Sequence, residues 1–418
     1  MTTDTLNLDA LFLPETVANP YPVYAELRAN DPVRWNALTQ MWMVSRYEDV
    51  LAVLQDDRRF ISSWPLKRQL AAELSEQERA DWGYIMDVFS LMILNKDNPE
   101  HARQRALVHK VFTPRTVMKL RERVVEMVDE LLTKVEAKGT FEVIADLALP
   151  LPATIIFDMC GVPLELRTAI KAGADAAVTA FGLTNPAPGQ LAQLAQVVRT
   201  SERLLRELVN ERRGSGGDDV LSLLLSAEEN GAVLTEDEVV AFIYLLVTAG
   251  FETTTNLIAN GLVALLRNPE QLELLQANPA LLEGAVEELA RYDSPVHVIF
   301  RMTNEDVTVG ETQIPAGQMV MVLLAAANRD EEQYQDADQL DITRRAARHA
   351  SFGYGAHYCL GAPLARLEVQ VALSEVLRRL PNLRLLSDTV DRAPDMIVRT
   401  VRSLPLAFDP PAWQQRAA

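Results

Sequence analysis

One cysteine near the C-terminal end of the chain lies in a short glycine-containing segment. The segment reads Ser-Phe-Gly-Tyr-Gly-Ala-His-Tyr-Cys-Leu-Gly from Ser351 to Gly361, so Cys359 follows His357 by two residues. A thiolate here could bind a metal, because the next residues read as a helix start and a helix N-terminus stabilises negative charge. Gly353 and Gly355 would let the loop adopt backbone angles closed to other residues. For an isolated thiol, a structural cysteine beside a tight turn is the alternative.

The order of these residues resembles the cysteine loop of the cytochrome P450 family, Phe-x-Gly-x-Gly-x-His-x-Cys-Leu-Gly. The resemblance implies that Cys359 is the axial ligand of haem b iron, because a thiolate ligand favours O–O cleavage. Phe352 would then shield the sulfur from water, and Gly361 would let the helix backbone approach the porphyrin. The alternate glycines are not a dinucleotide-binding fingerprint, because the third glycine and the downstream acid do not follow.

A second segment lies on a long apolar helix that is predicted from Thr235 to Leu266. Thr235 is a plausible N-cap, with Glu238 three residues later completing a capping box. A helix that is apolar on nearly all faces belongs in the middle of a protein. Within it, Gly250 and Glu252 are unfavourable residue types, which indicates that they are retained for a reason.

The sequence Ala-Gly-Phe-Glu-Thr-Thr at 249–254 resembles the oxygen-activating helix of P450s, Ala/Gly-Gly-x-Asp/Glu-Thr. By that resemblance Gly250 opens a groove for O₂, Thr253 hydrogen-bonds the distal oxygen and Glu252 relays protons from solvent. The chemistry needs two protons at one oxygen atom so that water leaves, and an alcohol beside an acid can organise their delivery. A helix kink with a glutamate reaching solvent is the alternative.

The family resemblance also implies cations for the two haem propionates. His101 and Arg105 stand four residues apart and hence on one helix face, Arg301 follows an apolar triplet, and His357 lies in the cysteine loop. A guanidinium matches the geometry of a carboxylate. Each of these residues alone would be an ordinary capping or surface charge.

Glu288 and Arg291 resemble the family's Glu-x-x-Arg pair, and the i, i+3 spacing places both charges on one helix face. Arg344 is the expected third member. We expect this triad to support the cysteine loop and to take no part in the chemistry. An ordinary helix salt bridge is the alternative.

The resemblance to the P450 family also implies which positions line a mostly apolar substrate site. At each of these positions, ordinary core packing is the alternative. The expected lining residues are Leu91, Met92, Ile93, Tyr244, Leu245, Thr248, Ala249, His297, Val298, Ile299, Met396, Ile397 and Val398. Tyr244, Thr248 and His297 are its polar candidates. Such a site fits a medium-sized apolar molecule: a terpenoid, steroid, fatty acid or polyketide.

Composition limits the other functions. The net charge of −18 argues against general nucleic-acid binding, and two cysteines leave no disulfide framework to propose. Cys160 lies in an apolar run and is predicted to be a core residue. Residues 1–7 do not resemble a signal peptide, and the longest apolar stretch, residues 239–251, is short for a membrane span. We therefore expect a cytoplasmic protein without membrane attachment, and a monomer.

Helical patterns dominate the chain, and short strand patterns occur early in the sequence and again late, from residue 307 onward. Helices are predicted at about 21–30, 47–54, 100–112, 115–137, 149–160, 164–181, 189–212 and 218–229, and strands at 33–35, 42–45, 307–309, 319–322 and 404–407. The fold class is thus mainly α with a small β-rich edge, as in the cytochrome P450 fold. Residues 1–418 are expected to form a single haem domain with no fused reductase.

Without a flavin or iron–sulfur module, electrons derived from NAD(P)H would have to arrive through a ferredoxin, or flavodoxin, and its reductase. Residues 101–123 form a basic segment with a single acid, Glu122, and its cations could attract an acidic ferredoxin. They are Arg103, Arg105, Lys110, Arg115, Lys119, Arg121 and Arg123. A solvated helix surface is the alternative.

The sequence thus predicts a P450 monooxygenase. Two other functions stay open: a P450-fold peroxygenase or isomerase that needs no reductase, and a non-enzymatic haem-based ligand carrier or sensor. The Glu252–Thr253 pair disfavours the former, and the absence of a recognisable output domain disfavours the latter.

Overall fold

The computed structural model describes residues 11, 13–63, 74–181, 186–214, 216–229, 231–345 and 348–409. Residues 1–7, whose sequence bears on targeting, lie outside this part. The chain divides into two compact units, each assembled from segments distant in sequence. Unit 1 comprises Met1–Ile61, Arg121–Pro152 and Glu252–Ala418, and unit 2 comprises Ser62–Leu120 and Ala153–Phe251. The expectation of a single domain therefore stays a prediction.

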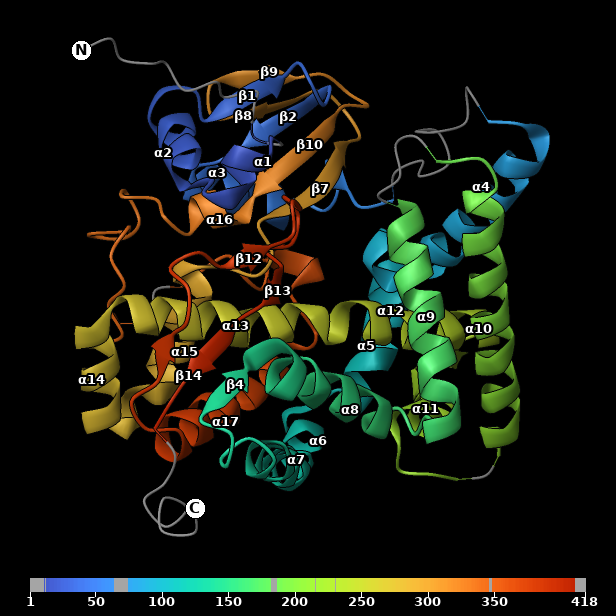
Figure 1. Ribbon diagram of the computed structural model, residues 1–418. Coiled ribbons are helices and arrows are strands. Elements are labelled where there is room, and N and C mark those ends of the chain that lie inside the picture. Colours follow the sequence, from blue (N-terminus) through green and yellow to red (C-terminus); the bar gives the residue numbers. More distant parts are fainter. Residues whose placement is uncertain are drawn as a thin grey trace. The chain divides into compact units, whose positions relative to one another are not determined.

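Unit 2 is mainly helical, and its helices α9 and α10 pack along each other, with α4 and α12 beside them (Figure 1). The capping box predicted at Thr235 and Glu238 is present at the start of α12. The elements are α4 (Glu76–Leu91), η3 (Ile93–Asn95), α5 (Glu100–Val111), α6 (Pro114–Lys119), most of α8 (Pro150–Met159), α9 (Leu164–Phe181), α10 (Gln190–Arg212), α11 (Val220–Ser226), β5 (Glu228–Glu229), β6 (Ala232–Val233) and α12 (Glu236–Gly250).

Unit 1 contains a five-stranded sheet in the order β1-β2-β10-β7-β3, in which only the β2–β10 pair is parallel. Alternate residues of β10 face opposite sides of the sheet. Val320 and Val322 join a core cluster with α3, whereas Met321 and Leu323 join a cluster with α2. The elements are α2 (Tyr21–Asn30), β1 (Val33–Asn36), β2 (Met41–Val44), α3 (Tyr47–Gln55), β3 (Phe60–Ile61), β7 (Val298–Thr303) and β10 (Met319–Leu323).

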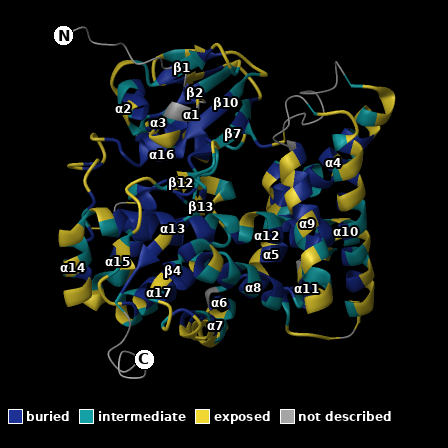
Figure 2. Ribbon diagram, in the orientation of Figure 1, coloured by how far each residue is buried: buried dark blue, intermediate teal, exposed yellow. Residues whose placement is uncertain are grey.

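The remainder of unit 1 includes α13, which packs against α15, α17 and η4 and is buried along most of its length (Figure 2). The elements are α1 (Pro14–Ala18), α7 (Arg121–Thr133), β4 (Thr140–Glu142), η4 (Ile144–Ala148), α13 (Glu252–Arg267), α14 (Pro269–Ala277), η5 (Pro279–Leu281), α15 (Leu282–Tyr292), β8 (Val307–Val309), β9 (Thr312–Ile314), α16 (Leu324–Ala327), η6 (Gly355–His357), α17 (Ala362–Arg379), β11 (Arg384–Leu385), β12 (Asp391–Arg392), β13 (Val401–Ser403) and β14 (Pro405–Ala407).

The predicted fold class, mainly α with small sheets, is confirmed. Three predicted helices differ in extent: the segment 115–137 is interrupted at Leu120, the long apolar helix is interrupted at Phe251, and the segment 218–229 ends as helix at Ser226. Cys160 is fully buried, as predicted. In the described ranges, the helical stretch Glu236–Arg267, taken across its interruption at Phe251, is long and apolar enough to cross a membrane, but 56% of its most apolar window is buried, as in a core helix.

Candidate active site

Cys359 lies on an exposed loop between η6 and α17. Its backbone N–H donates to the carbonyl oxygen of Phe352 at 2.8 Å, which closes the loop at its base. Gly353 and Gly355 have φ angles of 70° and 69°, in the left-handed region that favours glycine. At Gly355 a Cβ would overlap the carbonyl oxygen of Leu54. The loop therefore requires glycine at this position for two independent reasons.

A half-buried carboxylate on α15 connects that helix to the residues around the cysteine loop. Glu287 accepts hydrogen bonds from Arg366 Nε at 2.6 Å and Nη2 at 2.8 Å, and its other contact is His349 Nε2 at 3.2 Å. The Arg366 guanidinium lies 4.3 Å from the ring centroid of Phe352. Burial alone would raise the pKa of Glu287, but the hydrogen bonds from Arg366 and His349 lower it to about 2. A charged carboxylate therefore links α15, α17 and the cysteine loop at neutral pH.

The start of the loop is fixed by a second set of hydrogen bonds. The Ser351 hydroxyl donates to the carbonyl oxygen of Ala290 at 2.7 Å and accepts from Asn328 Nδ2 at 2.8 Å. The Asn328 side-chain oxygen accepts from the backbone N–H of Ala350 at 2.7 Å. The Asn328 side chain thus joins the segment after α16 to the first residues of the loop.

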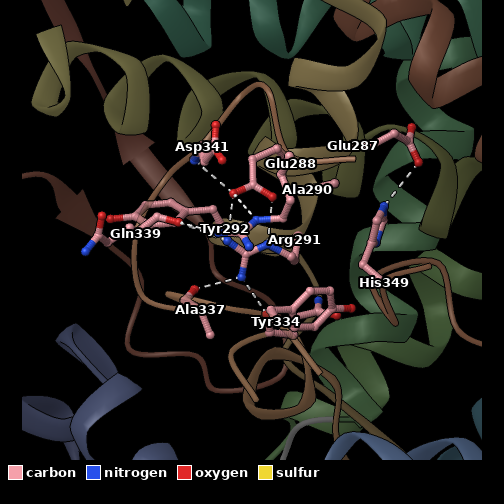
Figure 3. A network of polar contacts seen from close by, with 12 residues as sticks. Glu287, Glu288, Ala290, Arg291, Tyr292, Tyr334, Ala337, Gln339, Asp341 and His349 are labelled. Atoms are coloured by element: carbon pink, nitrogen blue, oxygen red, sulfur yellow. Dashed lines mark hydrogen bonds and ion pairs between the residues drawn. The ribbon is translucent and has the colours of Figure 1, made fainter. Parts of the chain in front are cut away.

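Glu288 and Arg291 form an ion pair on α15 (Figure 3), and Arg344 also pairs with Glu288. Arg291 donates to both carboxylate oxygens of Glu288 at 2.7 Å, and Arg344 Nε donates to Glu288 Oε1 at 3.2 Å. Arg291 also donates to the carbonyl oxygens of Asn328 and Ala337 at 2.7 and 2.8 Å. The side chains of Glu288 and Arg291 are 3% and 2% exposed, so this pair is fully desolvated. Asn328 connects it to the cysteine loop.

Gly250 is the last residue of α12, and the helical pattern is interrupted at Phe251 before α13 begins at Glu252. In unit 2 a Cβ at Gly250 would lie 2.8 Å from Ile156 Cδ1. Close packing against α8 therefore accounts for a glycine at this position. This packing neither requires nor contradicts the role expected for Gly250 beside O₂.

In unit 1, Glu252 and Thr253 form the half-buried first turn of α13. The Glu252 carboxylate accepts a hydrogen bond from the Thr400 hydroxyl at 3.4 Å, and its backbone carbonyl accepts one from Asn256 Nδ2 at 2.9 Å. Asn256 in turn accepts from the backbone N–H of Val401 at 2.8 Å. The segment that leads into β13 therefore holds the turn carrying the alcohol and the acid.

The propionate candidates are divided between the units. In unit 2, α5 carries His101, which is 3% exposed, and Arg105, whose Nε donates to His109 Nε2 at 2.9 Å. In unit 1, Arg301 on β7 is 8% exposed and donates to the carbonyl oxygen of Phe300 at 2.8 Å, and His357 is half-buried in η6.

Two of the polar candidates for substrate contact have hydroxyl groups that bond within unit 2. Tyr244 is fully buried, and its hydroxyl donates to the carbonyl oxygen of Val198 on α10 at 3.2 Å. The Thr248 hydroxyl donates to the carbonyl oxygen of Tyr244 at 2.8 Å. Both hydroxyls therefore have partners within unit 2, and the substrate contacts expected for Tyr244 and Thr248 stay predictions.

His297 is also a core residue. It is 3% exposed, and its Nδ1 lies 3.1 Å from the hydroxyl of Tyr24. Burial and the Arg399 guanidinium together lower its pKa to about 3 against the opposing effect of Asp293, so the ring is neutral at physiological pH. His297 thus packs between α2 and the sheet, and its role as a substrate contact stays a prediction.

The apolar candidates differ in exposure. Ala249 is exposed and Leu91, Leu245, Ile299, Ile397 and Val398 are half-buried, whereas Met92, Ile93, Val298 and Met396 are buried. The exposed and half-buried side chains have surface available for contact with a small molecule.

The metal-ligating side chains available around Cys359 are compatible with haem as the bound group. No cluster of three or more His, Cys, Asp or Glu residues among the described parts of the chain could hold a metal ion by itself. A metal at Cys359 would therefore need most of its ligands from elsewhere, as haem iron does from the porphyrin nitrogens. A Cβ at Gly361 would lie 3.9 Å from Cys359 Sγ, so glycine keeps the surface beside the sulfur open.

Sequence reasoning assigned no role to Glu287, His349, Asn328 or Thr400. These residues act through contacts between segments 22 to 148 positions apart. The adjacency of Glu287 and Glu288 was the only local signal for any of them.

A comparison with known families matches residues 35–395 to the family described as cytochrome P450. Among curated proteins, the cytochrome P450 monooxygenase PikC of Streptomyces venezuelae is 39% identical over 400 residues, which cover 94% of this chain and 91% of PikC. The vitamin D(3) 25-hydroxylase of Pseudonocardia autotrophica is 39% identical over 399 residues, with 94% of each chain covered.

Among solved structures, P450BioI in complex with an acyl carrier protein ligated to hexadec-9Z-enoic acid superposes with a TM-score of 0.86. That match has 35% sequence identity and covers 95% of this chain and 99% of P450BioI. Sequence and fold therefore agree over nearly the whole chain.

Proposed function

The chain belongs to the cytochrome P450 family, and on that premise we propose that it inserts one oxygen atom from O₂ into a mostly apolar organic substrate. It is an enzyme of the P450 class, and this family uses haem b, O₂ and electrons from partner proteins. Substrate, electron donor and the roles of individual residues are the parts that we propose.

The position of Cys359 carries this proposal. Cys359 lies on a loop fixed by Glu287, Arg366 and Ser351, and its backbone N–H donates to the carbonyl oxygen of Phe352. We assign Cys359 as the axial ligand, with Phe352 beside it and Gly353 and Gly361 giving the backbone its shape. Haem bound by a thiolate supplies O₂ binding and O–O cleavage.

Glu252 and Thr253 are assigned to proton delivery, with Gly250 beside the O₂ site. The Glu252 carboxylate exchanges protons with solvent, and the Thr253 hydroxyl, one residue further on, donates to the oxygen atom that leaves as water. The hydrogen bond from Thr400 orients the Glu252 carboxylate, and the bond from Asn256 fixes its backbone.

The remaining charged candidates are assigned to binding the haem propionates or to supporting the cysteine loop. His101, Arg105, Arg301 and His357 are assigned to the haem propionates. Glu288, Arg291 and Arg344 are assigned a structural role, supported by the route from Arg291 through Asn328 to Ser351.

The substrate is a terpenoid, steroid, fatty acid or polyketide. The apolar side chains with exposed surface, such as Ala249, Leu245 and Ile299, support this class. So do the relatives, because one is named as a hydroxylase of vitamin D(3) and another was solved with a fatty acyl chain on its carrier protein. Tyr244, Thr248 and His297 stay the proposed polar contacts of this site.

Electrons come from a separate ferredoxin or flavodoxin with its reductase, and the enzyme is a cytoplasmic monomer without membrane attachment. The test compares turnover of a substrate found by its shift of the Soret band, with NADPH plus ferredoxin and reductase, and separately with hydrogen peroxide. We expect O₂-dependent product with the redox partners. Product from peroxide alone would identify a peroxygenase, and binding without product in either assay would indicate a carrier or sensor.

A further inference from the structure

A cavity of about 510 Å³ opens in unit 1, and none of its lining residues belongs to the cysteine loop. It is bordered by the start of α2, the end of α13, the end of α15 and the segments around β12 and β13. Its volume falls within the range of small-molecule sites, which is about 300–1,000 Å³. None of the residues proposed above for haem, oxygen or substrate lines it.

The lining carries an excess of positive charge. Arg267, Arg329, Arg392 and Arg399 face two carboxylates, Asp293 and Asp338, which leaves a net charge of +2 in a chain whose net charge is −18. This local excess attracts anions to a concave surface.

Both carboxylates, Asp293 and Asp338, already accept hydrogen bonds from arginines of the lining. Asp293 is 8% exposed and accepts hydrogen bonds from the Tyr21 hydroxyl at 2.6 Å, Arg399 Nε at 2.8 Å and Arg392 Nη2 at 3.2 Å. Asp338 accepts from Arg329 Nη1 at 2.9 Å. Neither aspartate therefore neutralises a further guanidinium.

Arg392 and Arg267 use only some of their N–H donors in hydrogen bonds within the protein. A guanidinium has five N–H donors. Arg392 uses one for Asn260 at 2.7 Å and one for Asp293, and Arg267 uses one for the carbonyl oxygen of Asp388 at 2.7 Å. Burial lowers the pKa of Arg392, and the Arg399 and Arg267 guanidiniums lower it further against the opposing effect of Asp293. A bound anion would relieve this repulsion.

The side chains of the other two arginines, Arg329 and Arg399, are held in place by hydrogen bonds to backbone carbonyl oxygens. Arg329 donates to the carbonyl oxygen of Tyr292 through Nε at 2.9 Å, and its guanidinium lies 3.9 and 4.3 Å from the rings of Tyr292 and Tyr21. Arg399 donates to the carbonyl oxygens of Val17 and Ala18 at 3.1 and 3.2 Å. A ligand would therefore meet a preorganised surface, which reduces the entropy lost on binding.

We propose that this cavity is a binding site for an organic anion, held through a carboxylate or phosphate group by Arg267 and Arg392. Planar guanidiniums bind both groups through paired hydrogen bonds. The inference is independent of the proposed monooxygenase activity, and failure of either leaves the other standing.

The test is calorimetric titration of the haem-loaded protein with citrate and, separately, with inorganic phosphate, at an ionic strength held constant with chloride. We expect saturable one-to-one binding of at least one probe. Binding of citrate alone would identify a carboxylate site, and binding of phosphate alone a phosphate site. Arg267→Gln should weaken binding at least about tenfold, since each lost charge-assisted hydrogen bond is worth on the order of one decade.

Arg267 is exposed and has one backbone partner, so this variant should fold, which its unfolding temperature checks. Arg58→Gln is the matched control, because Arg58 is an exposed arginine of the same unit that pairs with Glu305 outside the cavity. Its affinity for the probe should equal that of the wild type. Absence of saturable binding up to about 10 mM of both probes, or equal loss in Arg267→Gln and Arg58→Gln, would overturn the proposal.

Discussion

Glu287 of α15 accepts two hydrogen bonds from Arg366 of α17, at 2.6 and 2.8 Å. Arg366 in turn stacks on Phe352, whose carbonyl oxygen accepts the backbone N–H of Cys359. One carboxylate therefore sets the position of the proposed iron ligand without touching it. The pair is only partly exposed, with 27% and 21% of the side chains accessible, so its loss should be measurable.

Glu287→Gln should destabilise the protein at neutral pH by on the order of 2 kcal/mol. Hydrogen bonds lower the pKa of Glu287 from 4.5 to about 2, so its contribution is fully present above pH 4.5 and disappears as the pH falls toward 2. The difference in unfolding free energy between wild type and variant, measured by denaturant unfolding, should therefore be largest at pH 7, shrink below pH 4.5 and vanish near pH 2. Glu207→Gln, at an exposed pair with Arg203, is the control and should change little at any pH. A difference that stays constant from pH 7 to pH 3 would remove the charge from the explanation.

Gly355→Ala should disrupt the cysteine loop. A Cβ there would overlap the backbone oxygen of Leu54, and the φ angle of 69° is unfavourable for alanine, so a cost of about 3 kcal/mol and loss of bound haem are expected. Gly189→Ala is the matched control, because Gly189 has a φ angle of 76° but no atom within 4 Å of its Cβ position. It should cost about 1 kcal/mol and retain haem. Equal effects of the two substitutions on haem content would contradict the role given to Leu54.

The sequence was informative where the signal is local. The capping box at Thr235 and Glu238, the fully buried Cys160 and the spacing of Glu288 and Arg291 all depend on residues close together in the chain. The same kind of signal was present for α4, where Ser75 and Glu78 form a capping box that the sequence analysis did not use.

The sequence was uninformative about contacts that depend on how distant segments pack together. Tyr244 and His297 match the register of substrate-contacting positions, and the sequence did not show that the Tyr244 hydroxyl bonds to Val198 or that His297 Nδ1 lies beside the Tyr24 hydroxyl. Likewise, Glu287 and Arg366 are 79 residues apart, and no periodicity connects them. Apolar patterning shows that a helix is buried but not which neighbour covers each face, so such contacts need the fold.

Thr253→Ala and Glu252→Gln should retain the spectrum of the haem–thiolate protein but lose coupling between NAD(P)H consumption and product. Without the alcohol and the acid, protons reach oxygen in the wrong order and electrons leave as hydrogen peroxide, so coupling should fall at least about tenfold. Thr255→Ala is the control, because the Thr255 hydroxyl bonds to the carbonyl oxygen of Ala148 in the core. Coupling that is unchanged in both test variants would remove the pair from the mechanism.

Reversing Arg115 and Lys119 to Glu should slow the first electron transfer from an acidic ferredoxin. Both side chains are exposed on α6, whereas Arg103 of the same basic segment is paired with Glu238, and Lys110 bonds to the carbonyl oxygen of Glu228. The attraction is screened over about 8 Å at physiological salt, so the wild-type rate should fall as ionic strength rises. Stopped-flow reduction measures both effects, and Arg203→Glu on α10 is the control. A rate indifferent to salt and to charge reversal would leave only a solvated helix surface.

The carbon monoxide complex of the reduced protein tests the assignment of Cys359 most directly. The wild type should show the red-shifted Soret band of a haem with a thiolate ligand, since only the thiolate pushes electron density onto the iron. Cys359→His should bind haem without that band, whereas Cys160→Ser, at the buried cysteine of unit 2, should keep it in whatever fraction folds. A normal thiolate band in Cys359→His would contradict the account.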